Sequence, residues 1–318
     1  MELRTLRSFL AVAREGNVTR AARSLHITQP ALSRQLAELE RELGCELLLR
    51  ESRGVTLTDE GMLLRKRAEE IVLLADRTEQ EIRSPEADIE GDVWVGGGET
   101  RAMVLIADVA QELSLRYPGL RLRLHSGNAD DVIERVEKGL LDFGLIIGRE
   151  PQAQYDSLQL PWQDRWGVLM RRDDPLAGCA SLTTEDLRGR RLIVSSQGAE
   201  PAHGEGTGLR LLGREGFDVV ATYTLAYNAS LMVERGLGIC VSFDQLIYAG
   251  EDSPFAFVPL TDLPTQGSRL IWKRYQPLSR ACDTFLHALR SRCEQEQEVE
   301  AEGAVRAEDG SLEAEELL

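Results

Sequence analysis

The segment ITQPALSRQL, residues 27–36, constrains the N-terminal fold of this chain most. A proline follows Thr28 and Gln29, and proline is well placed in the first turn of an α-helix, where its missing N–H costs nothing. Thr28 is a good N-cap because its hydroxyl can accept from the first free N–H groups. The sequence therefore predicts a helix that begins after residue 28 and buries one stripe of apolar residues at helical spacing, namely Leu32, Leu36, Leu39 and Leu43.

A shorter helix precedes this one, with a tight turn between the two. Small residues in the stretch 18–24 allow the helices to cross closely, and no acidic residue occurs from Gly16 to Ala37. Polar and basic side chains at the start of the second helix could reach base edges in a major groove, and the helix N-terminus suits a phosphate. We therefore expect a helix-turn-helix, although a helical hairpin with a solvated polar face remains open. The predicted DNA contacts are Thr28, Gln29, Pro30, Ser33 and Arg34.

The stretch LLLRESRGVTLTDEG, residues 47–61, predicts a two-stranded wing that turns at Gly54. Arg50 and Arg53 lie in or beside this turn, where they could contact the sugar-phosphate backbone or a minor groove. They complete the predicted set of DNA-binding residues.

One long helix without proline follows over residues 59–84. Its apolar residues recur at alternating spacings of 4 and 3, which is the pattern of a coiled-coil seam. A helix that packs on its own domain would give a similar pattern, and the spacing does not separate the two. The predicted dimerisation residues are Leu64, Ala68, Ile71, Ala75 and Ile82.

From Gly91 to about Arg292 short β-type runs alternate with amphipathic helices, which is typical of an α/β domain with a parallel or mixed sheet. Two such sets follow one another, and a final strand and helix return at the end. The alternation predicts two lobes with a cleft between them, where small ligands bind near strand ends and helix N-termini.

Charge is distributed unevenly along the 318 residues, whose net charge is −16. Residues 294–318 carry ten acids against Arg306 alone and are predicted to be disordered. The five cysteines are scattered, with no CxxC or Cys/His cluster, so we expect no metal site, disulfide or cofactor. No apolar run approaches the roughly 18 residues of a membrane helix. We therefore expect a cytoplasmic protein with no membrane partner.

The N-terminal half resembles the LysR-type transcriptional regulators. Residues 6–50 are similar to their N-terminal module, and LTDEG, residues 57–61, is similar to the start of their linker helix. Weaker similarity continues through DFGLIIG (142–148), DPLAG (174–178) and RGLGICVSF (235–243). Two positions depart from the family pattern: Leu49, where phenylalanine is usual, and Ser242–Asp244, where Leu-Pro is common.

The resemblance implies a multidomain chain. Residues 1–58 would form a winged helix-turn-helix, 59–87 a linker helix for dimerisation, and 91–293 an effector-binding domain similar to type 2 periplasmic binding proteins. Lobe I of this domain would take about 91–162 plus 268–293, and lobe II about 163–267. The implied partners are operator DNA, a small-molecule effector and further copies of the chain in a homodimer or homotetramer, with RNA polymerase as a candidate.

The effector site is predicted at the loop 97–101, where Thr100 and the N–H groups beyond it could hold an anion. Glu99 would repel an acidic effector unless Arg101 neutralises it, so the charge of the effector stays open. The family pattern adds Ser126, Ser195, Ser196, Gln197 and Asn228. Thr100 could equally serve only as an N-cap, and residues 195–197 only as a turn.

An enzyme that uses the same cleft is the competing class of function. The chain has no GxSxG, no HExxH and no Gly-Lys-Ser/Thr phosphate loop, so we expect no catalysis. The sequence favours a DNA-binding transcriptional regulator controlled by an effector. The alternative is a ligand-independent regulator whose cleft is vestigial.

Overall fold

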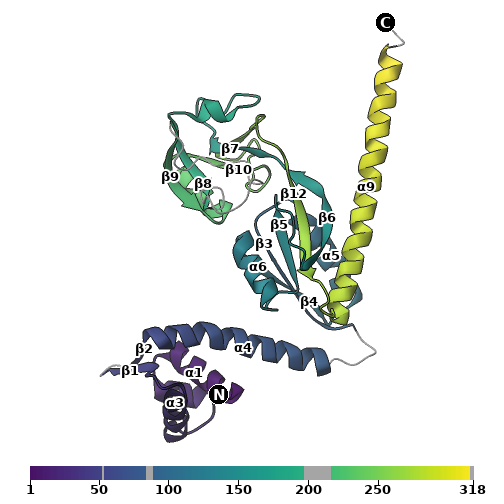
Figure 1. The fold of residues 1–318 in the computed structure, drawn as a ribbon. Helices are drawn as coiled ribbons and strands as arrows, with labels where there is room; N and C mark the ends of the chain where they lie inside the picture. Colours follow the sequence, from purple (N-terminus) through teal and green to yellow (C-terminus); the bar gives the residue numbers. More distant parts are fainter. Residues whose placement is uncertain (52–53, 84–88, 197–215, 316–318) are drawn as a thin grey trace. The chain divides into compact units, whose positions relative to one another are not determined.

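A computed structural model describes residues 1–51, 54–83, 89–196 and 216–315, and within these it describes no side chain for 50–51, 77, 80–83 and 298–315. The chain divides into two compact units, Met1–Pro85 and Glu86–Leu318. Figure 1 shows both, with the first unit in purple to blue and the second in teal to yellow.

The first unit is a three-helix core followed by a β-hairpin and a long helix. Its elements are α1 (Leu3–Glu15), α2 (Val18–Ser24), α3 (Gln29–Leu43), β1 (Leu48–Glu51), β2 (Gly54–Leu57) and α4 (Asp59–Arg83). Helices α1 and α3 each end at a glycine in the left-handed region, Gly16 at φ +59° and Gly44 at φ +71°. The core is apolar and comes from the three helices and the start of the hairpin: Phe9, Val12, Ala21, Ala22, Leu32, Leu36, Leu39 and Leu47.

The hairpin is tied to the helical core through its own backbone. Val55 N donates to Gly16 O at 2.9 Å, which joins β2 to the end of α1. Thr58 caps α4: its hydroxyl accepts from Gly61 N at 2.9 Å and donates to Glu46 O at 2.8 Å. The winged helix-turn-helix predicted for the N-terminus is therefore confirmed.

The second unit contains two five-stranded mixed sheets, each with its own core. The first sheet has the strand order β4-β3-β5-β12-β6 and the second the order β11-β7-β10-β8-β9. The first lobe comprises β3 (Gly91–Gly97), α5 (Met103–Arg116), β4 (Leu120–Ser126), α6 (Ala129–Glu137), β5 (Phe143–Ile147), β6 (Tyr155–Asp164), β12 (Gln266–Lys273) and α9 (Arg280–Glu315). The second comprises β7 (Trp166–Arg171), the 3-10 turn η1 (Thr184–Leu187), β8 (Arg191–Ser195), β9 (Asp218–Tyr223), α8 (Ala226–Glu234), β10 (Ile239–Phe243) and β11 (Phe255–Pro259).

The chain passes between the lobes twice, from β6 to β7 and back from β11 to β12. Strands β6 and β12 pair antiparallel, from Gln266 opposite Asp164 to Lys273 opposite Tyr155, so the two crossing segments lie side by side. Leu260 N donates to Trp166 O at 2.9 Å where they reach the second lobe. The predicted two-lobed α/β architecture is confirmed, and the paired crossings form the junction between the lobes.

The acidic end of the chain, which the sequence predicts to be disordered, is continuous with helix α9 as far as residue 315. Helix α9 begins at Arg280 and continues to Glu315 (Figure 1, yellow). Residues 294–315 are rich in alanine and glutamate and contain no proline, and both residue types have high helix propensity. Among the described side chains of α9, the last one buried in the core of the first lobe is Cys293, which is 3% exposed.

Candidate nucleic-acid interface and effector site

Helix α3 buries one face and presents the other at its N-terminus. Leu32, Leu36 and Leu39 are at most 2% exposed, whereas Leu43, which the sequence placed in the same stripe, is 42% exposed. Thr28 occupies the N-cap position with extended backbone (φ −80°, ψ 143°), and its side chain makes no capping hydrogen bond. The hydroxyl of Thr28 is therefore available to a partner outside the helix.

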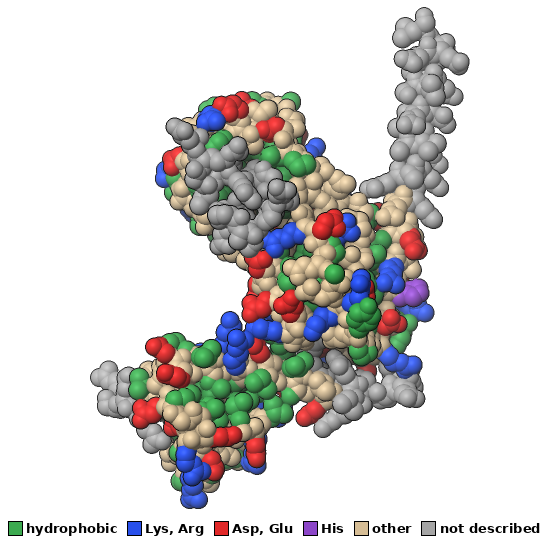
Figure 2. Space-filling model, viewed as in Figure 1, with side chains coloured by type: hydrophobic (Ala, Val, Ile, Leu, Met, Phe, Trp, Pro, Cys, Tyr) green, Lys and Arg blue, Asp and Glu red, His purple; other side chains and the backbone are tan. Residues whose placement is uncertain are grey.

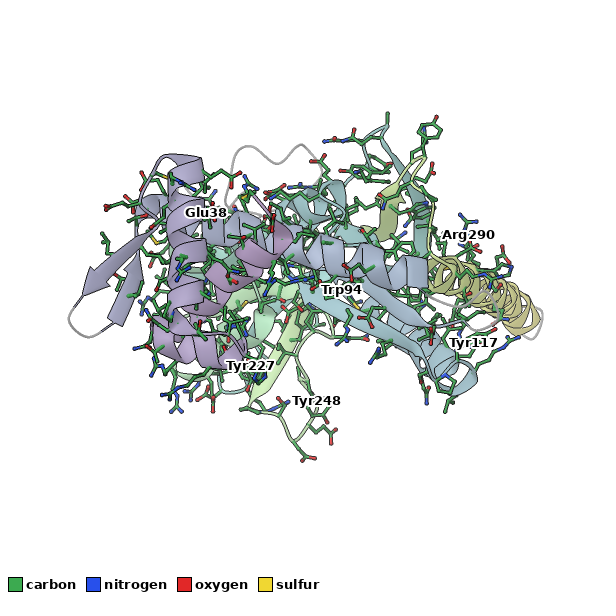
Figure 3. All side chains as sticks on the ribbon, turned by 90° about the horizontal axis from the view of Figure 1, so that it is seen from below. Glu38, Trp94, Tyr117, Tyr227, Tyr248 and Arg290 are labelled. Carbon is green, nitrogen blue, oxygen red and sulfur yellow. The ribbon has the colours of Figure 1, made fainter. Side chains whose placement is uncertain are left out.

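The side chains predicted to contact DNA gather on this exposed N-terminal face. Thr28, Gln29, Pro30 and Arg34 are exposed, and Ser33 is half-buried. Gln29 Nε2 donates to Ser33 Oγ at 2.9 Å, so these two side chains orient each other. Glu38, the first acid along α3, lies two turns from the helix start (Figure 3).

Arg34 has no acidic partner among the described residues. By contrast, Arg41 at the other end of α3 pairs with Glu38 at 2.8 Å, and Arg20 lies 3.6 Å from Glu15. An unpaired guanidinium on an acid-free face is free to meet a phosphate or the edge of a guanine.

Contacts that sequence reasoning missed hold α3 in place. Ser8 Oγ, 3% exposed, donates to Gln35 Oε1 at 3.1 Å and joins α1 to α3. Glu40 Oε1 accepts from Leu47 N at 2.8 Å and from Leu48 N at 3.1 Å, which anchors the wing to α3. Ser8 and Gln35 lie 27 residues apart, so no local pattern signals that bond, and the bonds of Glu40 cross the turn between α3 and β1.

The predicted wing forms, and its register pairs Leu48 with Leu57 and Glu51 with Gly54. Arg50 lies on β1, opposite Val55. The side chain of Arg50 and the whole of Arg53 lie outside the described residues. Their contact with DNA stays a prediction.

The predicted seam of α4 does not form one exposed face. Ala68 is fully buried and Leu64 packs against the core of the first unit, because α1 lies along this side of the helix. Ala75 is half-buried and Ile71 is 39% exposed, while the side chain of Ile82 lies outside the described residues. Leu64 and Ala68 therefore pack inside the first unit. This packing agrees with the alternative interpretation, in which α4 packs on its own domain.

Thr100 has a structural role that differs from the predicted ligand contact. It is 4% exposed, and its hydroxyl donates to Asp164 Oδ2 and lies 3.2 Å from Ser268 Oγ. The backbone N–H of Arg101 donates to the other oxygen, Asp164 Oδ1, at 3.1 Å. The anion position predicted at this loop is therefore filled by a carboxylate of the chain itself.

Asp164 sits at the end of β6, where the chain leaves the first lobe. It is 4% exposed, and burial raises the pKa of its carboxyl, although the hydrogen bonds from Thr100, Arg101 and Ser268 act in the opposite direction. This carboxyl joins the loop after β3 to strands β6 and β12 at the junction between the lobes.

Glu99 and Arg101, on either side of Thr100, do not neutralise each other. The guanidinium of Arg101 lies over the ring of Trp162, 5.2 Å from its centroid. Glu99 Oε2 instead accepts a hydrogen bond from the backbone N–H of Ala226, the first residue of α8 in the second lobe. The first and second lobes are thus joined through a carboxylate.

The remaining predicted effector residues are only partly brought together. Ser126 ends β4 and is exposed, and Asn228 is exposed in the first turn of α8. Ser195 and Ser196 are half-buried at the end of β8, and Gln197 lies outside the described residues. No side-chain hydrogen bond joins Ser126, Ser195, Ser196 or Asn228 to another described residue.

Comparison with known protein families identifies both units. The sequence model for "Bacterial regulatory helix-turn-helix protein, lysR family" matches residues 3–62, and that for "LysR substrate binding domain" matches residues 87–294. The chain belongs to the LysR family. It is accordingly a DNA-binding transcriptional regulator with a substrate-binding domain, as the sequence resemblance implied, and the family is one of regulators and not of enzymes.

Relatives of this LysR-family protein are similar over most of their length. The transcriptional regulator YfeR of Shigella flexneri is 26% identical over 292 residues, which cover 91% of this chain and 93% of the relative. YybE of Bacillus subtilis is 31% identical over 198 residues, which cover 62% of this chain and 68% of the relative. Both are named as HTH-type transcriptional regulators.

Solved structures show the same fold. CbnR, a LysR family transcriptional regulator, matches with a TM-score of 0.70 at 19% identity, covering 92% of this chain and 99% of CbnR. Full-length CbnR in complex with its target DNA matches with a TM-score of 0.69 at 20% identity, covering 92% of this chain and all of CbnR.

The described residues show neither a membrane-spanning helix nor a metal-binding cluster. None of the helices there combines the length and the apolar character that crossing a bilayer requires. The described residues also contain no group of three or more His, Cys, Asp or Glu side chains arranged to hold a metal ion.

Proposed function

We propose that this protein binds operator DNA sequence-specifically through the N-terminal face of α3 and that a small molecule bound between the two lobes controls its output. The observation that carries the DNA part is the exposed face with Thr28, Gln29 and Arg34, which has no acid among its neighbours in sequence. The helix N-terminus adds a partial positive charge for the phosphate backbone.

Dimerisation through α4 follows from the face that the helix leaves open. Leu63 is 61% and Leu74 43% exposed, and these two, eleven residues apart, share one side of the helix. Ile71, 39% exposed, lies between this side and that of Leu64 and Ala68. Figure 2 shows hydrophobic side chains gathered on the first unit, over and beside α4. Two copies joined along this face would carry two copies of α3, which suits an operator with two half-sites.

Substitution of Arg34 tests the DNA contact. A bidentate arginine–guanine pair contributes about 1–3 kcal/mol of discrimination, so Arg34→Ala should weaken binding to the operator at least fivefold more than binding to a scrambled duplex. Arg53→Ala should weaken both similarly and flatten the salt dependence by about one unit in the logarithmic slope. The measurement is a salt titration on both duplexes, with the operator selected from a random DNA library.

Arg41→Ala is the matched control, because it removes another exposed arginine from the same helix. Arg41 is paired with Glu38 and lies far from the N-terminal face. The control should keep the ratio of specific to non-specific affinity. An unchanged ratio in Arg34→Ala would mean that the N-terminal face of α3 is only solvated and does not read the operator.

Effector control rests on the two lobes and the paired crossings between them, since a ligand bound between lobes favours one of their arrangements. The alternative is a regulator that works without a ligand. A thermal-unfolding screen of small metabolites separates the two, because a ligand that binds the folded chain raises its melting temperature. A true effector should also change operator affinity, whereas an adventitious ligand should not.

A further inference from the structure

At two helix N-termini in the described part of this domain, backbone N–H groups already donate to carboxylates of the chain itself. The carboxylate of Asp164 accepts hydrogen bonds from the Thr100 hydroxyl and the Arg101 N–H, just before α5. The carboxylate of Glu99 accepts a hydrogen bond from the Ala226 N–H at the start of α8. Free N–H groups at a helix N-terminus are a common anion site, so an anionic effector that used either N-terminus would have to displace one of these side chains.

Glu99 substitutes for a missing cap on α8. The N-cap residue of this helix is Leu225, whose side chain offers no acceptor. An N-cap side chain normally satisfies one of the first free N–H groups. Here the acceptor, Glu99, belongs to the first lobe and the helix to the second, so this hydrogen bond depends on how the two lobes are placed.

The negative charge of Glu99 is not compensated by the described residues. No ion pair to Glu99 forms there, and Arg101 lies over Trp162 instead. Glu99 Oε2 accepts from Ala226, and the other oxygen, Oε1, has no donor among the described side chains and backbone groups. A half-buried carboxylate with one free oxygen can accept one further hydrogen bond.

Two titratable groups near Glu99, Tyr223 and Cys240, have raised pKa values and are neutral at pH 7. Burial raises the pKa of Tyr223 well above its ordinary value, and the nearby Cys240 and Glu99 raise it further. Burial also raises the pKa of Cys240 to about 12, and the charge of Glu99 adds to this shift. The Tyr223 hydroxyl donates to Val241 O of β10 at 2.9 Å, so it is turned toward the interior of its own sheet. These groups feel the negative field of Glu99 without cancelling it.

We propose that the effector of this regulator carries a cationic group, a protonated amine, that binds the free oxygen of Glu99, and that Glu99 excludes anionic effectors. The inference deepens the proposed function and rests on its effector control. A protonated amine supplies N–H donors and the missing positive charge together. The ring of Tyr227, next to Ala226 and 64% exposed (Figure 3), offers an aromatic face of the kind that attracts cations.

Three matched sets of probes test this charge selection on the full chain. They are linear mono- and diamines of two to six carbons, the alcohols of the same lengths and the carboxylates of the same lengths, at equal ionic strength. The readout is the rise in melting temperature with probe concentration. We expect amines to stabilise the wild-type chain at concentrations at least tenfold lower than alcohols or carboxylates do.

Glu99→Gln is the decisive variant, because glutamine keeps an oxygen to accept from Ala226 and removes only the charge. It should raise the amine concentration needed at least tenfold. Glu112→Gln is the control: Glu112 is exposed on α5, has no ion pair with a described residue, and its substitution removes one charge elsewhere in the same lobe. This control should respond to amines as the wild type does.

Each contrary outcome has a distinct meaning. Stabilisation by carboxylates at lower concentrations than amines, an amine response that survives Glu99→Gln, or no amine response at all would overturn the charge assignment. Effector control would still stand if alcohols or carboxylates shifted both the melting temperature and operator affinity. Loss of the Arg34 effect on DNA would instead contradict the proposed function and leave the selection by Glu99 untouched.

Discussion

Gly61 shows how one residue fixes the joint between the wing and the long helix. A Cβ atom at this position would lie 2.1 Å from Leu47 O, a backbone atom that no rotamer change can move away. Gly61 is helical with an ordinary φ, so the requirement comes from close approach and not from backbone conformation.

Gly61→Ala should therefore destabilise the first unit by about 3 kcal/mol, since overpacking typically costs about 1–3 kcal/mol. Gly44→Ala is the control: Gly44 has φ +71° and no atom within 4 Å of the added Cβ, so only about 1 kcal/mol of left-handed strain is expected. All four tryptophans lie in the second unit, so amide hydrogen exchange in α1 and α3 is the measurement. Equal loss of protection in both variants would contradict this account of Gly61.

Asp131 is held by two basic side chains beside the β4–α6 loop. Its carboxylate contacts His125 Nε2 and accepts from Arg135 Nε at 2.9 Å. Burial alone would raise the pKa of Asp131, but the hydrogen bonds and the charge of Arg135 outweigh it and hold the pKa below its usual value of 3.8. A depressed pKa stabilises the folded state above pH 3.8, and this contribution is lost as the pH falls through the folded-state pKa.

Asp131→Asn should lower the free energy of unfolding at pH 7 by less than about 1 kcal/mol, because the pair is partly exposed and screened by solvent. The difference from the wild type should shrink as the pH falls below 3.8. Urea unfolding at several pH values, followed by tryptophan fluorescence, measures both quantities. A difference that stays constant with pH would assign the effect to packing and not to charge.

At the scale of one element, α4 has apolar residues on two sides, one buried within the first unit and the other exposed. One face, with Ala68 and Leu64, packs against α1, and Arg7 of α1 also pairs with Asp76 of α4. Leu63 and Leu74 are exposed on a second side, and Ile71, seven residues after Leu64, is exposed at the border between the two sides. Heptad-like spacing alone cannot assign these faces, since both recur at helical intervals.

Ile71→Glu should weaken self-association at least tenfold, because it places like charges across a symmetric contact while the first unit stays folded. Lys66→Glu is the matched control, since Lys66 is exposed on the same helix and its substitution also adds negative charge. Ala68→Glu should instead unfold the first unit, because it buries a charge. Light scattering gives the mass, and amide exchange reports folding; an unchanged mass in Ile71→Glu would remove this face from the interface.

For the whole molecule, the arrangement of charge matters more than its sum. The net charge of −16 includes ten acids and one arginine from residues 294–318, while the stretch 16–37 has no acid at all. A polyanion responds to the local field near α3, whereas the tail adds long-range repulsion that salt screens.

Truncation after Gln295 should leave specific operator affinity within about twofold and should raise non-specific DNA affinity several-fold at low salt. The difference should vanish at high salt, where the Debye length becomes short. Salt titrations on operator and scrambled duplexes measure this. Loss of specific binding in a truncated chain that keeps its melting temperature would give the tail a direct role.

The sequence by itself determined the elements whose signals are local. The acid-free start of α3, the proline in its first turn, the wing and the α/β alternation were all predicted from neighbouring residues, because helix caps and apolar periodicity act within a few turns. Resemblance to LysR-type regulators then supplied the order of the domains. Strands β6 and β11 have weaker patterns, and sequence reasoning did not separate them from loops.

Only the tertiary structure decided which polar groups meet. Thr100 was predicted as a ligand contact, and it is buried because Asp164, 64 residues later, lies beside it. The sequence left open whether Arg101 neutralises Glu99, and in the structure Glu99 accepts a hydrogen bond from Ala226, 127 residues away. Such partners are set by how strands and lobes are placed in space, and burial changes the free energy of a charge far more than local sequence does.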